Sequence, residues 1–118
     1  TDCSIYAMLG SHPGLGQRLA GCEPGEVALS AVCYAEIVIG NTLGYPPDAE
    51  VIDAFIRVIP VMPFDEQAAR TYGGLPFNRA RFDRLLAAHA LSIGAVVVTN
   101  NPGDYADVPG LVIENWAE

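Results

Sequence analysis

Oxygen-bearing side chains that suit a metal site occur at four widely separated places in this sequence. They are Asp2, Glu36, Asp83 and the pair Asn101 and Asp104, each near the predicted end of a strand. In an open parallel sheet the carboxyl ends of the strands meet at one edge, where such folds bind ligands. Crowded carboxylates repel one another unless a cation neutralises them, and Mg²⁺ prefers oxygen ligands. The spacing therefore predicts a divalent metal site at that edge.

The charged residues give two opposing indications about a nucleic-acid partner. The formal net charge is −8 and lysine is absent, which argues against a protein that binds phosphates over a broad surface. However, Arg79, Arg81 and Arg84 fall within six residues and bracket Asp83. An acidic site beside an arginine patch suits a phosphodiester held against a metal ion. Taken alone, the patch is explained equally well as the solvated face of a helix.

Length and composition indicate one globular domain over residues 1–118. Apolar residues make up 51% of the chain and the mean hydropathy is +0.27, which is enough for one well-buried core. No apolar run approaches the roughly 20 residues that cross a bilayer, and no signal peptide is visible, so no membrane partner is expected. The cysteines, Cys3, Cys22 and Cys33, match no zinc or redox spacing. We expect reduced, buried thiols in a cytoplasmic protein.

Helical and β-prone segments alternate along the chain. Helices are predicted over residues 4–9, 15–20, 30–39, 48–59, 65–72 and 79–93, and strands over residues 27–29, 61–63, 96–99 and 111–113. Strands separated by helices predict right-handed βαβ units in a three-layer α/β/α domain with a central parallel sheet. Such a sheet would also have an apolar strand just before Asp2, so we expect its first strand to be missing or truncated.

Two local features of these helices are also predicted. Ser30, Asp48 and Asp65 stand where a side chain caps the first turn of a helix. In the segment 79–93, the inner stripe is predicted from helical spacing to hold Phe82, Leu85, Leu86, His89 and Ile93. On this stripe His89 is interpreted as a packed structural histidine.

Four segments, taken in this order, resemble the PIN-domain ribonucleases, and within them the VapC-type toxins of bacterial toxin–antitoxin pairs. They are Ala-Glu at 35–36 followed by Gly40, the stretch 75–91, Val-Thr-Asn-Asn at 98–101, and Val-Pro-Gly-Leu-Val-Ile-Glu-Asn-Trp at 108–116. The similarity covers nearly the whole chain and implies a PIN-like fold.

The resemblance implies a catalytic set and a reaction. The family's three acids carry over to Asp2, Glu36 and Asp83, and its fourth acidic position carries over to Asn101, which is neutral here. Asp104 lies three residues further on and is the alternative fourth metal ligand. Family members cut RNA with Mg²⁺ or Mn²⁺ and leave a 5′-phosphate and a 3′-hydroxyl. Such an ion lowers the pKa of a bound water and stabilises charge in an in-line displacement.

Substrate contacts and partners follow from the same resemblance. Hydroxyls of Ser4 and Thr99 are expected to orient a water or a ligand, and Arg79, Arg81 or Arg84 to clamp a phosphate. A cognate antitoxin is expected to place its tail, with a basic side chain, in the acidic cleft. A homodimer is also implied, and the apolar helix at 48–59 is a candidate for its interface.

One alternative from another functional class stays open. A catalytically inactive PIN-like module would only bind an antitoxin or another protein, and both the neutral Asn101 and the expected loss of the first strand favour it. A phospho-receiver domain and a haloacid-dehalogenase-like phosphatase both require a lysine, which this sequence lacks. No glycine-rich phosphate loop follows a predicted strand, so a nucleotide-binding module is unsupported.

Overall fold

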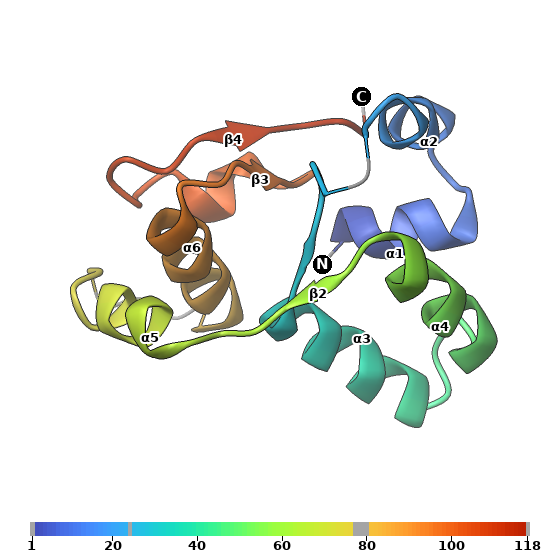
Figure 1. The fold of residues 1–118 in the computed structure, drawn as a ribbon, viewed down its shortest axis with the longest axis horizontal. Coiled ribbons are helices and arrows are strands. Elements are labelled where there is room, and N and C mark those ends of the chain that lie inside the picture. The colour runs from blue at the N-terminus through green and yellow to red at the C-terminus, as the bar shows by residue number, and fades with distance from the viewer. Residues whose placement is uncertain (1, 24, 77–80, 118) are drawn as a thin grey trace.

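The computed structural model describes residues 2–23, 25–76 and 81–117, with the side chain of Arg81 outside the description. Helices and short strands alternate along this part of the chain (Figure 1). In chain order the elements are α1 (Asp2–Leu9), α2 (Pro13–Ala20), β1 (Leu29–Ser30), α3 (Ala31–Thr42), α4 (Ala49–Val58), β2 (Val61–Met62), α5 (Glu66–Gly73), α6 (Arg81–Ile93), β3 (Val97–Val98), the 3₁₀ helix η1 (Pro102–Tyr105) and β4 (Ile113–Glu114). Among the described residues, no helix combines the length and apolar character that a membrane span requires.

The strands form two parallel pairs. β1 pairs with β2 in the register Leu29 to Val61, and β3 pairs with β4 in the register Val97 to Ile113. The predicted α/β class with parallel strands is therefore confirmed. The strands are shorter than predicted, and within the described residues no strand hydrogen-bonds the two pairs into one sheet. In Figure 1 the pair β3–β4 lies beside α6, whereas the pair β1–β2 lies beside α3.

The apolar core follows this division into two halves. One cluster joins α6 to β3, η1 and the loop after η1, and the other joins β1 and α3 to α4. Leu86 on α6 packs against both clusters. Helix α6 therefore holds the two halves of the molecule together, and it packs along α5 on another side.

All three predicted cap residues stand at the N-cap position of a helix, and two of them make the capping hydrogen bond. The Ser30 side chain accepts a hydrogen bond from the backbone N–H of Val32, and Asp65 accepts one from Ala68. Each of these bonds satisfies one of the free N–H groups in a first helical turn. Asp48 occupies the cap position of α4, but its side chain makes no capping hydrogen bond.

The predicted inner stripe of α6 is wrong at both of its ends. Phe82 is 51% exposed and Ile93 is 50% exposed. The buried face instead contains Ala87, Ala88 and Ala90, whose small side chains allow close approach of α5 and the strands. The sequence-based prediction missed this face because it relied on the spacing of large apolar residues, whereas the residues of this face are alanines.

His89 is a buried structural residue, as predicted. Its Nδ1 lies 2.7 Å from the hydroxyl of Ser30, and its ring meets the ring of Phe64 edge-on. This hydrogen bond connects α6 to the start of α3. Burial lowers the pKa of His89 below the ordinary value of 6.5, although the negative charge of Asp65 acts in the opposite direction.

The lowered pKa of His89 predicts an acid-sensitive fold. The unfolded chain binds a proton at this ring more readily than the folded chain, so the free energy of unfolding falls as the pH drops below about 6.5. In a His89→Gln variant this acid-induced loss should be smaller. Urea unfolding followed at several pH values from 7.5 to about 5 measures it. Equal slopes in the parent and the His89 variant would contradict the prediction.

Candidate active site

Asp2 and Asn101, predicted as site residues from opposite ends of the chain, are in direct contact. The Asn101 Nδ2 donates a hydrogen bond of 2.9 Å to Oδ2 of Asp2, and the backbone N–H of Asn100 donates one of 3.1 Å to the same oxygen. Oδ1 of Asp2 accepts from the N–H of Cys3 at the start of α1. The start of α1 is therefore joined to the loop that follows β3.

A second contact organises Asp83, which lies in the first turn of α6. The hydroxyl of Tyr105 donates a hydrogen bond of 3.2 Å to its Oδ1. The pKa of Asp83 is raised chiefly by burial and also by the negative charges of Asp104 and Glu36, while the bond from Tyr105 acts against the rise. Asp83 is thus within electrostatic range of two other predicted site residues, one on α3 and one on η1.

Tyr105 links the two parts of this site. It is 4% exposed, and burial is the main cause of its raised pKa, followed by the charge of Asp83 and the hydrogen bond to it. The charge of Asp2 contributes to the same rise. The phenol therefore stays protonated and serves as a donor to Asp83.

The site suits a hard cation in the chemistry of its donors. Carboxylate oxygens of Asp2, Glu36, Asp83 and Asp104, with the amide of Asn101, are the ligand types that Mg²⁺ and Mn²⁺ prefer. Within the described part of the chain, however, no group of three or more histidine, cysteine, aspartate or glutamate side chains is close enough to hold one ion. Hydrogen bonds hold the carboxylates of Asp2 and Asp83, and Glu36 and Asp104 lie within electrostatic range of Asp83.

The hydroxyls predicted to contact substrate lie in different surroundings. Thr99 is buried, and its Oγ1 accepts a hydrogen bond of 3.0 Å from the N–H of Asn101, so it shapes the loop that carries Asn101. Ser4 is half-buried and lines the cavity between the two strand pairs.

The three arginines of the predicted phosphate clamp differ in what the structure describes. Arg79 and the side chain of Arg81 lie outside the described residues. Arg84 is only 3% exposed and pairs with Asp107, while its Nε and Nη1 have no hydrogen-bond partner among the described residues. Its guanidinium therefore holds the loop after η1 against α6 instead of facing a bound phosphate from the surface.

Two contributors to the site were absent from the sequence-based prediction. Asn100 contacts Asp2 through its backbone N–H, and its side-chain oxygen accepts a hydrogen bond from Asn115. Tyr105 follows Asp104 in η1, a short turn without the periodicity that reveals which side chains point inward. The sequence feature that could have indicated Tyr105 was its position directly after Asp104, a candidate acid.

Comparisons with known proteins place the fold and the family. No family model matches the sequence. A tRNA(fMet)-specific endonuclease VapC from Shigella flexneri is 32% identical, over 99% of this chain and 95% of the relative. The VapBC complex of Salmonella typhimurium bound to DNA contains a chain with 28% identity and a TM-score of 0.80, covering 95% of this chain and 91% of that one. A chain of VapBC2 from Rickettsia felis, bound to a promoter DNA fragment, reaches a TM-score of 0.84 at 24% identity, covering 98% and 94%.

Fold and site together define an α/β domain of the PIN type, with acidic residues gathered from α1, α3, α6 and η1. The chain belongs to the VapC family of ribonucleases, because its similarity to curated VapC proteins extends over its whole length.

The contact between Tyr105 and Asp83 predicts a measurable loss of stability. A Tyr105→Phe variant keeps the buried ring but removes the donor, and should lower the free energy of unfolding by about 1 kcal/mol. Denaturant unfolding at neutral pH measures this loss. Tyr72→Phe is the matched control, since Tyr72 on α5 is half-buried and its hydroxyl makes no hydrogen bond to the described residues. Equal stabilities of the two variants would contradict a role for the Tyr105 hydroxyl.

Proposed function

We propose that this protein is a metal-dependent endoribonuclease toxin that uses Mg²⁺ or Mn²⁺ and is neutralised by a cognate antitoxin. The observation that carries the proposal is the gathering of acids from distant parts of the sequence around Asp83 and Asp2. Asp83 lies within electrostatic range of Glu36 and Asp104, and Asp2 binds Asn101. Membership of the VapC family supports a nuclease over other uses of such a cluster.

In this proposal Asp2, Glu36, Asp83 and Asp104 hold the ion. A bound divalent cation lowers the pKa of a water molecule and stabilises charge on the phosphoryl oxygens of the substrate. Tyr105 holds the carboxylate of Asp83 and Asn101 holds that of Asp2, so fewer side-chain rotamers would have to be searched when these acids bind an ion. Asn101 replaces the charge of a fourth acid with a neutral amide, which lowers repulsion among the carboxylates.

RNA is the proposed substrate, and its phosphates are the proposed targets of Arg79 and Arg81. In this proposal Arg84 is a buried structural residue that holds α6 to the loop after η1. Thr99 shapes the Asn101 loop, and Ser4 on α1 lines the cavity. Because the relative from Shigella flexneri is named a tRNA(fMet)-specific endonuclease, initiator transfer RNA is the first substrate to test.

The proposed partners are an antitoxin and a second copy of this chain, acting in the cytoplasm. Similar solved chains come from VapBC complexes, and a net charge of −8 favours a partner that brings basic side chains to the acids. For a homodimer, the apolar Val51 and Val58 on α4 are exposed at 39% and 77%. Light scattering of the purified chain tests the dimer directly.

Catalysis by these acids predicts a strong loss in conservative variants. Asp83→Asn keeps the shape and an acceptor for Tyr105 but removes a charge, so Mg²⁺-dependent cleavage of initiator transfer RNA should fall about 100-fold or more. Asp2→Asn and Glu36→Gln should act alike. Initial cleavage rates on gels measure the effect. Asp53→Asn, on the exposed side of α4, should retain the parent rate. A parent chain that binds antitoxin but never cleaves RNA would instead establish the catalytically inactive module.

The pairing of Asp2 with Asn101 predicts a metal-dependent stability. Asn101→Asp replaces the Nδ2 donor, 2.9 Å from Oδ2 of Asp2, with a second carboxylate oxygen. Without metal this should lower the free energy of unfolding by about 1–3 kcal/mol, and added Mg²⁺ should recover most of the loss. Thermal unfolding in EDTA and in Mg²⁺ measures both values. Asn41→Asp removes another amide donor, the one to the carbonyl of Pro47, and its loss should not respond to Mg²⁺.

A further inference from the structure

Beyond the ends of β3 and β4, a side-chain contact joins the two segments. The last ladder bond runs from the backbone N–H of Thr99 to the carbonyl of Glu114, at 3.0 Å. The N–H of Asn101 donates instead to Oγ1 of Thr99, and within the described residues no backbone hydrogen bond joins the segments after this point. The contact there comes from Asn115, whose Nδ2 donates to Oδ1 of Asn100 at 3.1 Å. Asn115 therefore extends the pairing of β3 with β4 to the loop that carries Asn101.

Both ends of the Asn115 side chain are used. Its Oδ1 accepts a hydrogen bond of 2.9 Å from the N–H of Ala117, while its Nδ2 donates to Asn100. A carboxamide can do both, because it carries an acceptor oxygen and a donor nitrogen, whereas an ionised carboxylate has no donor. The local bond to Ala117 orients the amide, so that its nitrogen faces the loop after β3.

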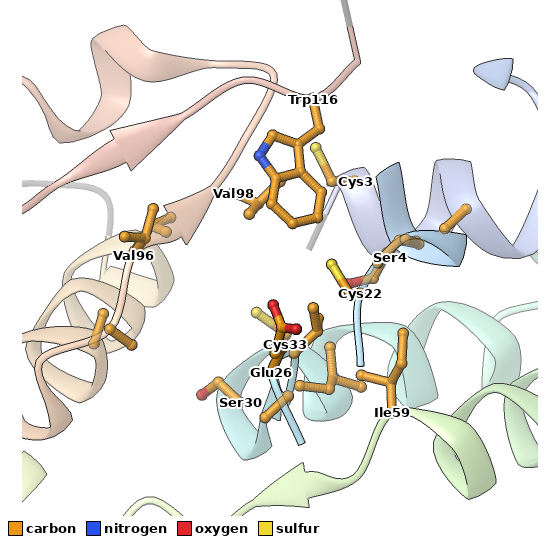
Figure 2. A pocket seen from close by; sticks show the side chains of 18 of the residues that line it. Cys3, Ser4, Cys22, Glu26, Ser30, Cys33, Ile59, Val96, Val98 and Trp116 are labelled. Atoms are coloured by element: carbon orange, nitrogen blue, oxygen red, sulfur yellow. The ribbon is translucent and has the colours of Figure 1, made fainter. Parts of the chain in front are cut away.

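The segment that carries Asn115 is itself held in place by its neighbours. Nε1 of Trp116 donates to Oε1 of Glu114 at 2.9 Å, and Nη2 of Arg18 on α2 lies 3.3 Å from the same oxygen. The guanidinium of Arg18 also lies over the indole ring, which forms part of the cavity wall (Figure 2). An exposed ion pair alone contributes little, but here the ion pair, the hydrogen bond and the ring contact involve the same three side chains. Asn115 thus stands on a supported segment.

Asn100 connects this segment to the first of the acids. The backbone N–H of Asn100 donates to Oδ2 of Asp2 at 3.1 Å, and Nδ2 of Asn101 donates to the same oxygen at 2.9 Å. Because both donors come from consecutive residues of one loop, a shift of that loop would disturb both bonds. The side chain of Asn100 is the one that Asn115 holds. Every group in this connection is neutral, so none of them competes with a cation for the carboxylate.

We propose that Asn115 is a positioning residue for Asp2 and that it acts through Asn100. The proposal rests on the proposed function in that it takes Asp2 as an acid of the nuclease site. Partners that orient a metal ligand typically change affinity or activity by about 10- to 100-fold when they are removed. Asn115 bonds to the residue that holds Asp2 and not to Asp2 itself, so we expect an effect at the lower end of that range.

Hydrogen exchange of the Asn100 amide in the full chain, measured by NMR without metal, tests the connection. Asn115→Leu keeps the approximate shape of the side chain and removes both of its polar ends. The amide of Asn100 should then exchange about 3- to 10-fold faster than in the parent, because opening of the loop breaks one bond fewer. Asn41→Leu is the matched control, since it removes another half-buried amide, the one that donates to the carbonyl of Pro47. Equal acceleration by both variants, or none in Asn115→Leu, would overturn the proposal.

Cleavage kinetics separate positioning from a general loss of stability. For Mg²⁺-dependent cleavage of initiator transfer RNA, kcat should fall about 10-fold in Asn115→Leu while KM stays within about twofold. Asn100→Ala removes the acceptor of the same bond, so it should have the same effect, and it tests the bond even if Asn115→Leu does not fold. The double variant should lose no more than either single variant, because the two side chains act through one contact.

Two kinetic results would overturn the role of Asn115. One is an additive loss in the double variant, and the other is an equal fall of kcat in Asn41→Leu. A parent chain that cleaves no RNA would instead refute the proposed function. In that case the exchange rate of the Asn100 amide still decides whether Asn115 holds the loop against Asp2.

Discussion

Crowded carboxylates need compensation, and this protein supplies it with neutral hydrogen-bond donors. Asp2 receives the N–H groups of Cys3 and Asn100 and the amide of Asn101, and Asp83 receives the hydroxyl of Tyr105. None of these donors adds a charge, so the acids keep their attraction for a cation while their positions are set. The same bonds join the start of α1 to the loop after β3 and η1 to α6. The arrangement of the site and the closure of the fold therefore depend on one set of contacts.

Helix α6 connects these contacts to both halves of the molecule. Leu86 packs against both apolar clusters, His89 binds Ser30 at the start of α3, and the buried Arg84 pairs with Asp107 beyond η1. Asp83 stands in the first turn of the same helix, so its position is tied to all three contacts. A guanidinium buried within the helix packing is costly to desolvate, and its pairing with Asp107 offsets part of that cost. Because its guanidinium is buried and paired with Asp107, Arg84 is not available at the surface.

Topology could be predicted from the sequence better than packing. The alternation of elements was sufficient to expect Asp2 near Asn101 and Asp83 near Glu36, although within the described residues the strands form two separate pairs instead of one sheet. The inner face of α6 was mispredicted, since periodicity weighs large residues such as Phe82 and overlooks alanines. Tyr105 was missed because a 3₁₀ turn has no repeating pattern. Arg84 was expected at the surface because nothing in its local sequence indicates Asp107, 23 residues away.

Trp116 is the only tryptophan of the chain, and its surroundings turn it into an optical reporter. Its ring lies under the guanidinium of Arg18 at 4.5 Å, and its Nε1 donates to the Glu114 carboxylate that also pairs with Arg18. The indole also forms part of the wall between the two strand pairs (Figure 2). Indole fluorescence depends on nearby water and charge, so any molecule that enters there will alter the emission of a single, fully assigned fluorophore.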